Sequence, residues 1–339
     1  MDIIDSSNLR ESEDLKMNSE LNRGYVARTK SPRKNSVAES IRLGSGAFEY
    51  ELRLSFFHLP AQLSNNVISG VCRVGGFFVL STYSKDYPLA LFDESGSFVR
   101  FVKCPVDIIH AHSCSATGSN TFLLTDSSAH AVYELSLGGE LIHTFGNPGK
   151  ASDSGIDPVA WEIDRNNAYL SIQRAAEPFC FPTKAIQGKD CRYYVSDGHG
   201  NAAVHIFSDK GELLSSFGGP GWESGNFNTP HSICLVDDLL CIADRDNDRV
   251  SFFDLDGSFK SEICGLLHPV DVSFKDGYLY VAEKDGRISI FDGSHEIVGQ
   301  IGYCGSPFAA SSLFVDYDGS IFITLCRKPY PVVKLEVIR

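Results

Sequence analysis

Two consecutive units in the stretch 195–254 follow one plan. Each has an apolar strand ending in Asp, a polar turn, a second apolar strand of the Val-x-x-Phe kind and a hairpin that contains Gly. Repeats of about forty residues built from short strands indicate a β-propeller, in which each unit forms one blade. The second unit opens with Pro230 and His231. A His at the same point of different blades would face the central channel, where imidazoles can hold a metal.

The same plan extends along most of the chain. An acidic residue ends the second strand of four units, at Asp126, Asp197, Asp244 and Glu283. We interpret these acids as turn-forming groups that bind backbone N–H groups, because repeats select such residues for architecture. Units begin near Pro105, Pro182, Pro230 and Pro269, with an earlier unit over about 67–103 and a last unit from about Ser306. The count predicts six blades, and seven is the nearest alternative.

The ends of the chain predict how the ring closes. The last unit has room for three strands, and residues 49–57 can supply the fourth, which removes exposed sheet edges. Residues 1–46 are polar and poor in aromatics, so we predict a disordered tail. The prediction is therefore an all-β, six-bladed propeller over residues 47–339, closed by an N-terminal strand. Residues 147–180 form a longer insert that would overhang one face.

Charge and cysteine usage narrow the class of protein. The 339 residues carry a formal net charge of −13, which argues against nonspecific nucleic-acid binding. There is no apolar run of membrane-spanning length and no apolar signal core, so we expect no membrane association. The ten cysteines form no Cys-x-x-Cys pair, as suits a reducing compartment. We therefore expect a cytoplasmic monomer.

Several runs carry a likeness to a known family. They are FCFPTKA after position 178, YVSDGHGNAAVHIFS, GNFNTPHSICLV and CIADRDNDRVSFFD. The chain resembles NHL-repeat propellers and, among them, the peptidyl-α-hydroxyglycine α-amidating lyases. The resemblance implies a zinc ion held in the channel by three histidines, a Tyr and an Arg beside the substrate, and a structural calcium ion. It also implies cleavage of a carbinolamide N–C bond to an amide and glyoxylate.

Two of the three implied metal ligands have counterparts here. His231, in the string TPHS, matches one ligand, and His112, in HAHS, matches another. His112 lies 14 residues before Asp126, and His231 lies 13 residues before Asp244. The third ligand is expected in the last blade, where Ser311 or Ser312 stands instead. His268, in a neighbouring blade, is a possible substitute.

The implied catalytic residues depart further from the family pattern. His199 occupies the position of the family Tyr, and we assign it the role of base. Arg245 matches the family string and is our candidate anchor for a substrate carboxylate. The family Arg of the first blade has no clear counterpart. Cys180 matches a family cysteine, but its partner position is Gly200, so that disulfide is missing.

Three functional hypotheses follow. In the first, the chain is a metal-dependent lyase acting on a small-molecule or peptide carbinolamide. In the second, it is a degenerate propeller that binds a protein partner on a loop face, because fold does not dictate function. In the third, it is a lactonase-like metal hydrolase, for which we place no carboxylate ligands. Bound metal distinguishes the first hypothesis from the second.

Overall fold

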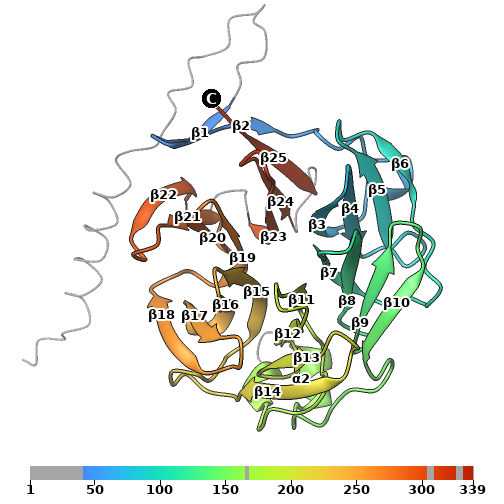
Figure 1. The fold of residues 1–339 in the computed structure, drawn as a ribbon, viewed down its shortest axis with the longest axis vertical. Coiled ribbons are helices and arrows are strands. Elements are labelled where there is room, and N and C mark those ends of the chain that lie inside the picture. The colour runs from blue at the N-terminus through green and yellow to red at the C-terminus, as the bar shows by residue number, and fades with distance from the viewer. Residues whose placement is uncertain (1–40, 165–167, 304–308, 326–330, 339) are drawn as a thin grey trace, which may run out of the picture.

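A computed structural model describes residues 41–164, 168–303, 309–325 and 331–338. In this part of the chain, six antiparallel sheets are arranged around a central axis (Figure 1). The predicted six-bladed propeller is therefore confirmed. The innermost strand of each blade leads into the second, third and outermost strands in chain order, except in the closing blade.

The strands of the first five blades have these bounds. The first two blades contain β3 (Ile68–Val74), β4 (Phe77–Thr82), β5 (Leu89–Asp93) and β6 (Phe98–Phe101), then β7 (Ala111–Ala116), β8 (Thr121–Asp126), β9 (Ala131–Ser136) and β10 (Leu141–Gly146). The third and fourth contain β11 (Lys184–Gln187), β12 (Tyr193–Asp197), β13 (Ala203–Phe207) and β14 (Leu213–Gly218), then β15 (Pro230–Val236), β16 (Leu239–Asp244), β17 (Arg249–Asp254) and β18 (Phe259–Cys264). The fifth contains β19 (Pro269–Lys275), β20 (Tyr278–Glu283), β21 (Arg287–Phe291) and β22 (Ile297–Gly302).

The closing blade joins the two ends of the chain. It contains β23 (Ala310–Val315), β24 (Ile321–Leu325) and β25 (Val332–Val337) from the C-terminal part, with β2 (Phe48–Arg53) and β1 (Arg42–Ser45) outside them. Strand β2 pairs with β25 from Tyr50 opposite Val337 to Arg53 opposite Lys334. Closure by an N-terminal strand is confirmed. Strand β1, however, lies inside the segment predicted as a disordered tail. Its four residues are ordered as a strand because they pair with the free edge of β2. The rest of that segment, 1–40, and the predicted unit start at Ser306 lie outside the described residues.

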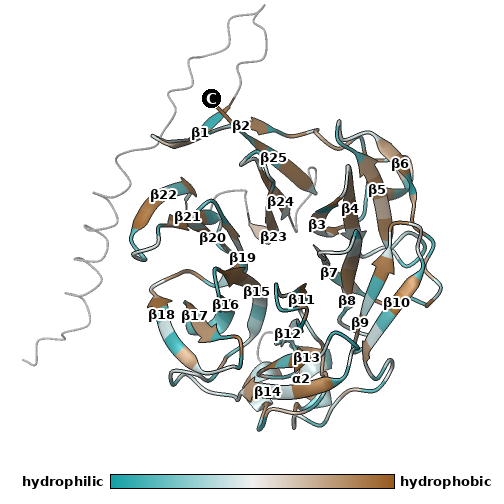
Figure 2. Cartoon of the chain, viewed as in Figure 1, coloured by the Kyte–Doolittle hydropathy of each residue, from teal (hydrophilic) through white to brown (hydrophobic). Residues whose placement is uncertain are grey.

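Apolar side chains fill the space between neighbouring blades. The cluster between the first and second blades, for example, combines Cys72 and Leu91 with Phe122 and Leu124, all buried. Figure 2 shows apolar residues on the inner strands of several blades. Because the blades pack face to face, each one fixes the position of the inner strands beside it.

The recurrent acids hold the loops that lead into the inner strands. Asp126 accepts hydrogen bonds from the backbone N–H groups of Ile109 and His110, at 2.6 and 2.9 Å. Equivalent bonds connect Cys180 N–H to Asp197 (2.8 Å), Asn228 N–H to Asp244 (2.7 Å) and Leu267 N–H to Glu283 (2.7 Å). The architectural interpretation of these acids is confirmed, and each bond holds the loop that enters the inner strand of the acid's own blade.

A β-bulge near the start of five inner strands determines what faces the channel. The pairing register shifts across a single residue, which stays outside the ladder; these residues are Ser69, His112, His231, Val270 and Ser311. A bulge re-aims the side chain of the extra residue. Two of the five positions hold His, and the fold thereby directs two imidazoles from non-adjacent blades toward each other.

The insert between β10 and β11 lies over the third blade. It contains a helix, α2 (Pro158–Ile163), capped by Asp157, whose carboxylate accepts the Val159 N–H at 2.8 Å, and a short 3-10 turn, η3 (Tyr169–Ser171). Ile172 anchors this insert in the core of the third and fourth blades. Two other 3-10 turns are η2 (Ala61–Leu63) and η4 (Arg245–Asn247). Within the described residues, none of the helices has the length and apolar character needed to cross a membrane.

Candidate metal centre

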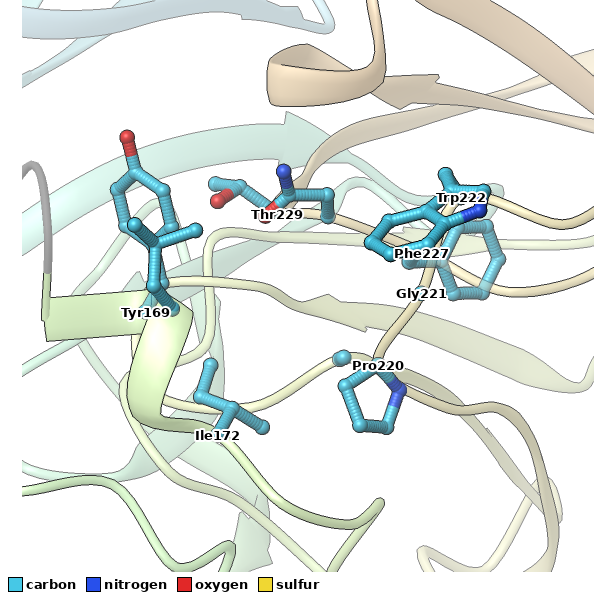
Figure 3. A pocket seen from close by; sticks show the side chains of 10 residues that line it. Tyr169, Ile172, Pro220, Gly221, Trp222, Phe227 and Thr229 are labelled. Carbon is cyan, nitrogen blue, oxygen red and sulfur yellow. The ribbon is translucent and has the colours of Figure 1, made fainter.

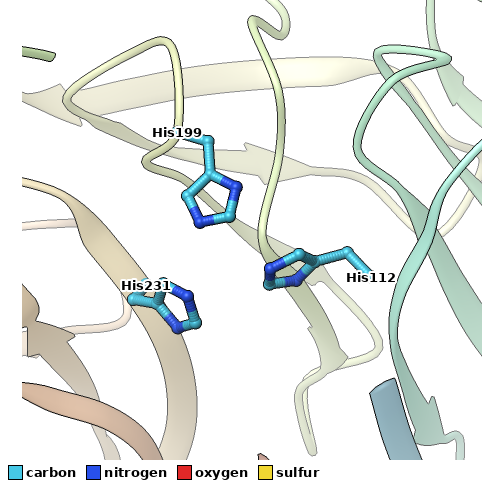
Figure 4. A group of neighbouring side chains, drawn as sticks. All are labelled: His112, His199 and His231. Atoms are coloured by element: carbon cyan, nitrogen blue, oxygen red, sulfur yellow. The ribbon is translucent and has the colours of Figure 1, made fainter. Parts of the chain in front are cut away.

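Three histidines from three blades, two on inner strands and one in a turn, meet in the channel. His112, His199 and His231 each offer a ring nitrogen, and the three nitrogens lie within 4.8 Å of one another (Figure 4). The ring centroids are 4.7 Å apart for His112 and His199, 5.2 Å for His112 and His231, and 5.1 Å for His199 and His231. We call this set the His triad.

Backbone carbonyls of the next blade orient two members of the triad. The Nδ1 of His112 lies 2.7 Å from the carbonyl oxygen of Thr183, and the Nδ1 of His231 lies 2.7 Å from that of Val270. A carbonyl oxygen only accepts, so each Nδ1 carries the proton and donates it. The lone pair of a neutral ring is then on Nε2, which is the arrangement found around ligating histidines.

The third member comes from the turn between β12 and β13. His199 follows Gly198, and a Cβ atom on Gly198 would lie 2.3 Å from the carbonyl oxygen of Pro230. The missing side chain therefore lets this turn lie directly against the backbone that precedes His231. The His199 N–H donates to the Phe181 carbonyl oxygen at 3.3 Å, which fixes the other side of the turn.

Burial keeps the triad neutral. Burial, assisted by the neighbouring His110, lowers the pKa of His112 to about 4. Burial also holds the pKa of His199 and of His231 well below the ordinary range, assisted by the other imidazoles and by Arg245. Neutral imidazoles present lone pairs, so at neutral pH the triad is prepared to bind a cation rather than a proton.

The donor set fits a metal that prefers nitrogen ligands. Three imidazoles with an open fourth position are the protein ligands of many catalytic zinc sites. Zn–N bonds of about 2.0–2.1 Å place tetrahedral nitrogens about 3.4 Å apart, so these nitrogens would close by up to about 1.4 Å on binding. Imidazole also suits copper, iron and nickel, so the donor set alone leaves the identity of the metal open.

The structure places the other residues singled out in the sequence as follows. Ser311 occupies the bulge position of the last blade, in register with His112 and His231. His268 is 46% exposed and lies 3.9 Å from each of two carboxylates, apart from the triad. Cys180 does lie beside Gly200, since a Cβ atom there would be 2.7 Å from the Cys180 sulfur. The eight cysteines in the described part of the chain are free thiols.

The two arginines of the fourth blade have different surroundings. Arg245 is buried in η4, forms an ion pair with Asp246 at 2.9 Å and lies over the ring of Tyr169, and its charge acts on the whole triad. Arg249 pairs with Asp244 at 2.8 Å and donates to carbonyl oxygens of the loop before β15. Arg245 therefore lies near the candidate site, and Arg249 is structural.

Two residues near the triad, His110 and Tyr169, were not singled out from the sequence. His110 lies with its ring 6.4 Å from His112 and packs against Tyr83, at 4.1 Å between centroids. Its place two residues before His112, in the string HAHS, was the signal that the sequence offered. Tyr169, from the insert, contacts Arg245 at 5.7 Å, and no sequence pattern indicated that contact.

Comparison with known proteins adds relatives that share the repeat. No family model matches the chain. The probable peptidyl-α-hydroxyglycine α-amidating lyase pgal-1 of Caenorhabditis elegans is 35% identical over 79 residues, which cover 22% of this chain and 23% of the relative. The NHL repeat-containing protein 3 of Homo sapiens is 28% identical over 234 residues, or 64% of this chain and 60% of the relative. The chain is a six-bladed propeller that is similar to NHL repeat-containing protein 3 and to amidating lyases.

The first relatives are much longer than the match. The peptidylglycine α-amidating monooxygenase of Rattus norvegicus is 29% identical over 158 residues, and these cover 43% of this chain but 14% of the relative. Solved structures show the same fold. A streptogramin B lyase matches with a TM-score of 0.57 at 14% identity, and the match covers 83% of this chain and 96% of the lyase. A gluconolactonase from Xanthomonas campestris matches with a TM-score of 0.61 at 13% identity, and the match covers 92% of this chain and 99% of the gluconolactonase.

Proposed function

We propose that this protein is a metal-dependent lyase that cleaves the N–C bond of a carbinolamide to release an amide and glyoxylate. The observation that carries the proposal is the His triad, three neutral imidazoles facing one point of the channel. The relatives named as amidating lyases supply the class of reaction. Zinc is the metal that we expect there, because three His ligands are its common catalytic set.

The triad supplies the metal ligands in this proposal. His112 and His231 bind through Nε2, because their Nδ1 atoms are committed to carbonyl oxygens. His199 completes the set in place of the missing ligand at Ser311. A bound divalent ion would lower the pKa of the substrate hydroxyl and polarise it.

The reaction needs a base and an anchor besides the ligands. Removing the hydroxyl proton lets the electrons of the O–H bond form the aldehyde C=O of glyoxylate, while the C–N pair leaves with nitrogen and takes up a proton. The sequence assigned the base role to His199, but a lone pair that binds metal cannot accept that proton. If His199 is a ligand, His110 is the imidazole placed to take the proton. Arg245, beside the triad, would hold the substrate carboxylate by sharing its guanidinium with Asp246.

Metal content tests the proposal first. We expect about one zinc ion per chain in protein purified without chelator, and none in the His112→Ala, His231→Ala double variant. His268→Ala is the matched control, because this imidazole lies outside the triad and its loss should leave the metal in place.

Product formation tests the reaction itself. The metal-loaded protein should release glyoxylate from N-benzoyl-α-hydroxyglycine, and the double variant should not. Protein that takes up no transition metal when zinc is offered would overturn the lyase proposal. It would favour the alternative of a binding propeller without catalysis.

A further inference from the structure

A small, largely apolar pocket adjoins the segment that leads into β15, the strand that carries His231. It has a volume of about 200 Å³ and lies between the η3 turn of the insert and the loop before β15 (Figure 3). Tyr169 and Ile172 line one side, and Pro220, Trp222 and Phe227 line the other, with Thr229 between them. We call it the Trp222 pocket.

Two links connect the Trp222 pocket with the triad. Thr229 lines the pocket and lies two residues before His231, so the Cα atoms of these two residues are at most about 7 Å apart. Arg245 donates its backbone N–H to the Thr229 carbonyl oxygen at 3.0 Å, and its guanidinium lies 5.7 Å from the centre of the Tyr169 ring. The candidate carboxylate anchor therefore forms part of the boundary between pocket and triad.

The exposed ring of Trp222 comes from a loop whose backbone is well held. Trp222 is 79% exposed and Leu170 is 68% exposed. Yet the Trp222 carbonyl oxygen accepts a hydrogen bond from Arg249 at 2.9 Å, and that of Gly221 accepts one from Asn247 at 3.0 Å. A large aromatic ring that is exposed on a fixed loop is a feature of binding sites, because little entropy is lost when a ligand covers it.

We propose that the Trp222 pocket binds the apolar side group next to the scissile carbinolamide, and that an aromatic ring fits it best. This inference rests on the proposed function. An apolar cavity of about 150 Å³ is enough to hold benzene, so the present volume admits a phenyl ring. An extended residue spans about 3.5 Å, so a group one or two residues before the reacting carbon reaches the pocket while that carbon lies at the triad.

Substrate preference tests this assignment. We expect kcat/KM for N-benzoyl-α-hydroxyglycine to exceed that for N-acetyl-α-hydroxyglycine by about tenfold or more, because ring–ring contact and burial favour the benzoyl group. Trp222→Ala should reduce that ratio by about tenfold. Leu214→Ala is the matched control, since this exposed apolar residue on β14 lies outside the pocket, and it should leave the ratio unchanged.

A binding measurement separates this inference from the proposed function. Trp161→Phe leaves Trp222 as the only tryptophan, so its fluorescence reports on the pocket. Quenching by N-benzoylglycine but not by N-acetylglycine, without any turnover, would support the pocket and overturn the lyase proposal. Turnover with equal kcat/KM for both substrates, or a preference that Trp222→Ala leaves intact, would overturn the pocket. The absence of both quenching and turnover would overturn both proposals.

Discussion

The imidazole of His112 donates a hydrogen bond from Nδ1 to the backbone carbonyl oxygen of Thr183 over 2.7 Å. Thr183 immediately precedes the inner strand of the next blade, so one blade orients a ligand that another blade carries. His231 has the same relationship with Val270. The geometry of the triad is therefore a property of how the blades are packed, and substitutions that loosen this packing should change metal affinity.

His199→Ala distinguishes a ligand from a base. If His199 binds metal, the variant should bind zinc at least tenfold more weakly, because loss of an imidazole leaves two protein ligands. Competition with a chromophoric chelator measures the affinity. Unchanged affinity together with lost turnover would instead assign His199 the role of base that the sequence suggested.

Ser311→His should restore a third ligand from the last blade. Ser311 occupies the same bulge position as His112 and His231, so a His there would enter the channel. In a His199→Tyr background, which lacks the third imidazole, we expect Ser311→His to recover most of the lost zinc affinity. Ser312→His provides the comparison, because Ser312 lies in the regular ladder opposite Thr324. Equal recovery by both would contradict the assignment of the bulge.

Gly198→Ala should weaken metal binding through the backbone. The new Cβ atom would lie 2.3 Å from the Pro230 carbonyl oxygen, a contact with main chain that only movement of the turn relieves. His199 moves with that turn, so zinc affinity should fall by about tenfold or more. Gly293→Ala is the control, since nothing lies within 4 Å of a Cβ atom there. Isothermal titration with zinc measures both variants, and equal affinities would show that the turn adapts without moving His199.

Arg249→Met should destabilise the propeller by about 3–5 kcal/mol, because it leaves the buried Asp244 carboxylate without its cation. The loop before β15 would also lose three donors to its carbonyl oxygens. Lys260→Met, which breaks a half-exposed ion pair with Asp254, should cost no more than about 1 kcal/mol. Urea unfolding measures both, and a similar loss in the two variants would contradict the structural role of Arg249.

Glu134 predicts a dependence of stability on acid. Burial raises the pKa of this carboxyl, but hydrogen bonds from Thr121, His143 and Tyr193 outweigh burial and hold it below the ordinary value. As pH falls, this carboxyl takes up a proton in the unfolded state before it does so in the folded state. The stabilisation by Glu134 is therefore fully present above the unfolded pKa of about 4.5 and is lost as pH falls below that value towards the folded pKa. The difference in unfolding free energy between the parent and Glu134→Gln should therefore shrink from pH 6 to pH 3. Urea unfolding at each pH measures this difference, and a difference that stays constant would contradict the role of the hydrogen bonds to Glu134.

The repeat made much of the fold predictable from sequence. Acids at equivalent positions, such as Asp126 and Asp244, indicated both the number of blades and their own role, because each holds the entry to an inner strand. The three-strand last unit predicted closure by residues 49–57. Strand β1 escaped prediction because its four residues carry little apolar pattern and pair only with the edge of β2.

The candidate site was predictable only in part. The similar spacing before Asp126 and Asp244, 14 and 13 residues, singled out His112 and His231, because repeats place equivalent residues at equivalent points. No spacing connected His199 with them, since it lies in a different loop of a different blade. The sequence by itself determined the architecture and the two repeat-matched histidines, because both follow from local pattern. Only the tertiary structure decided that His199 joins them and that Tyr169 meets Arg245, because closing the ring brings together loops that are distant in the chain.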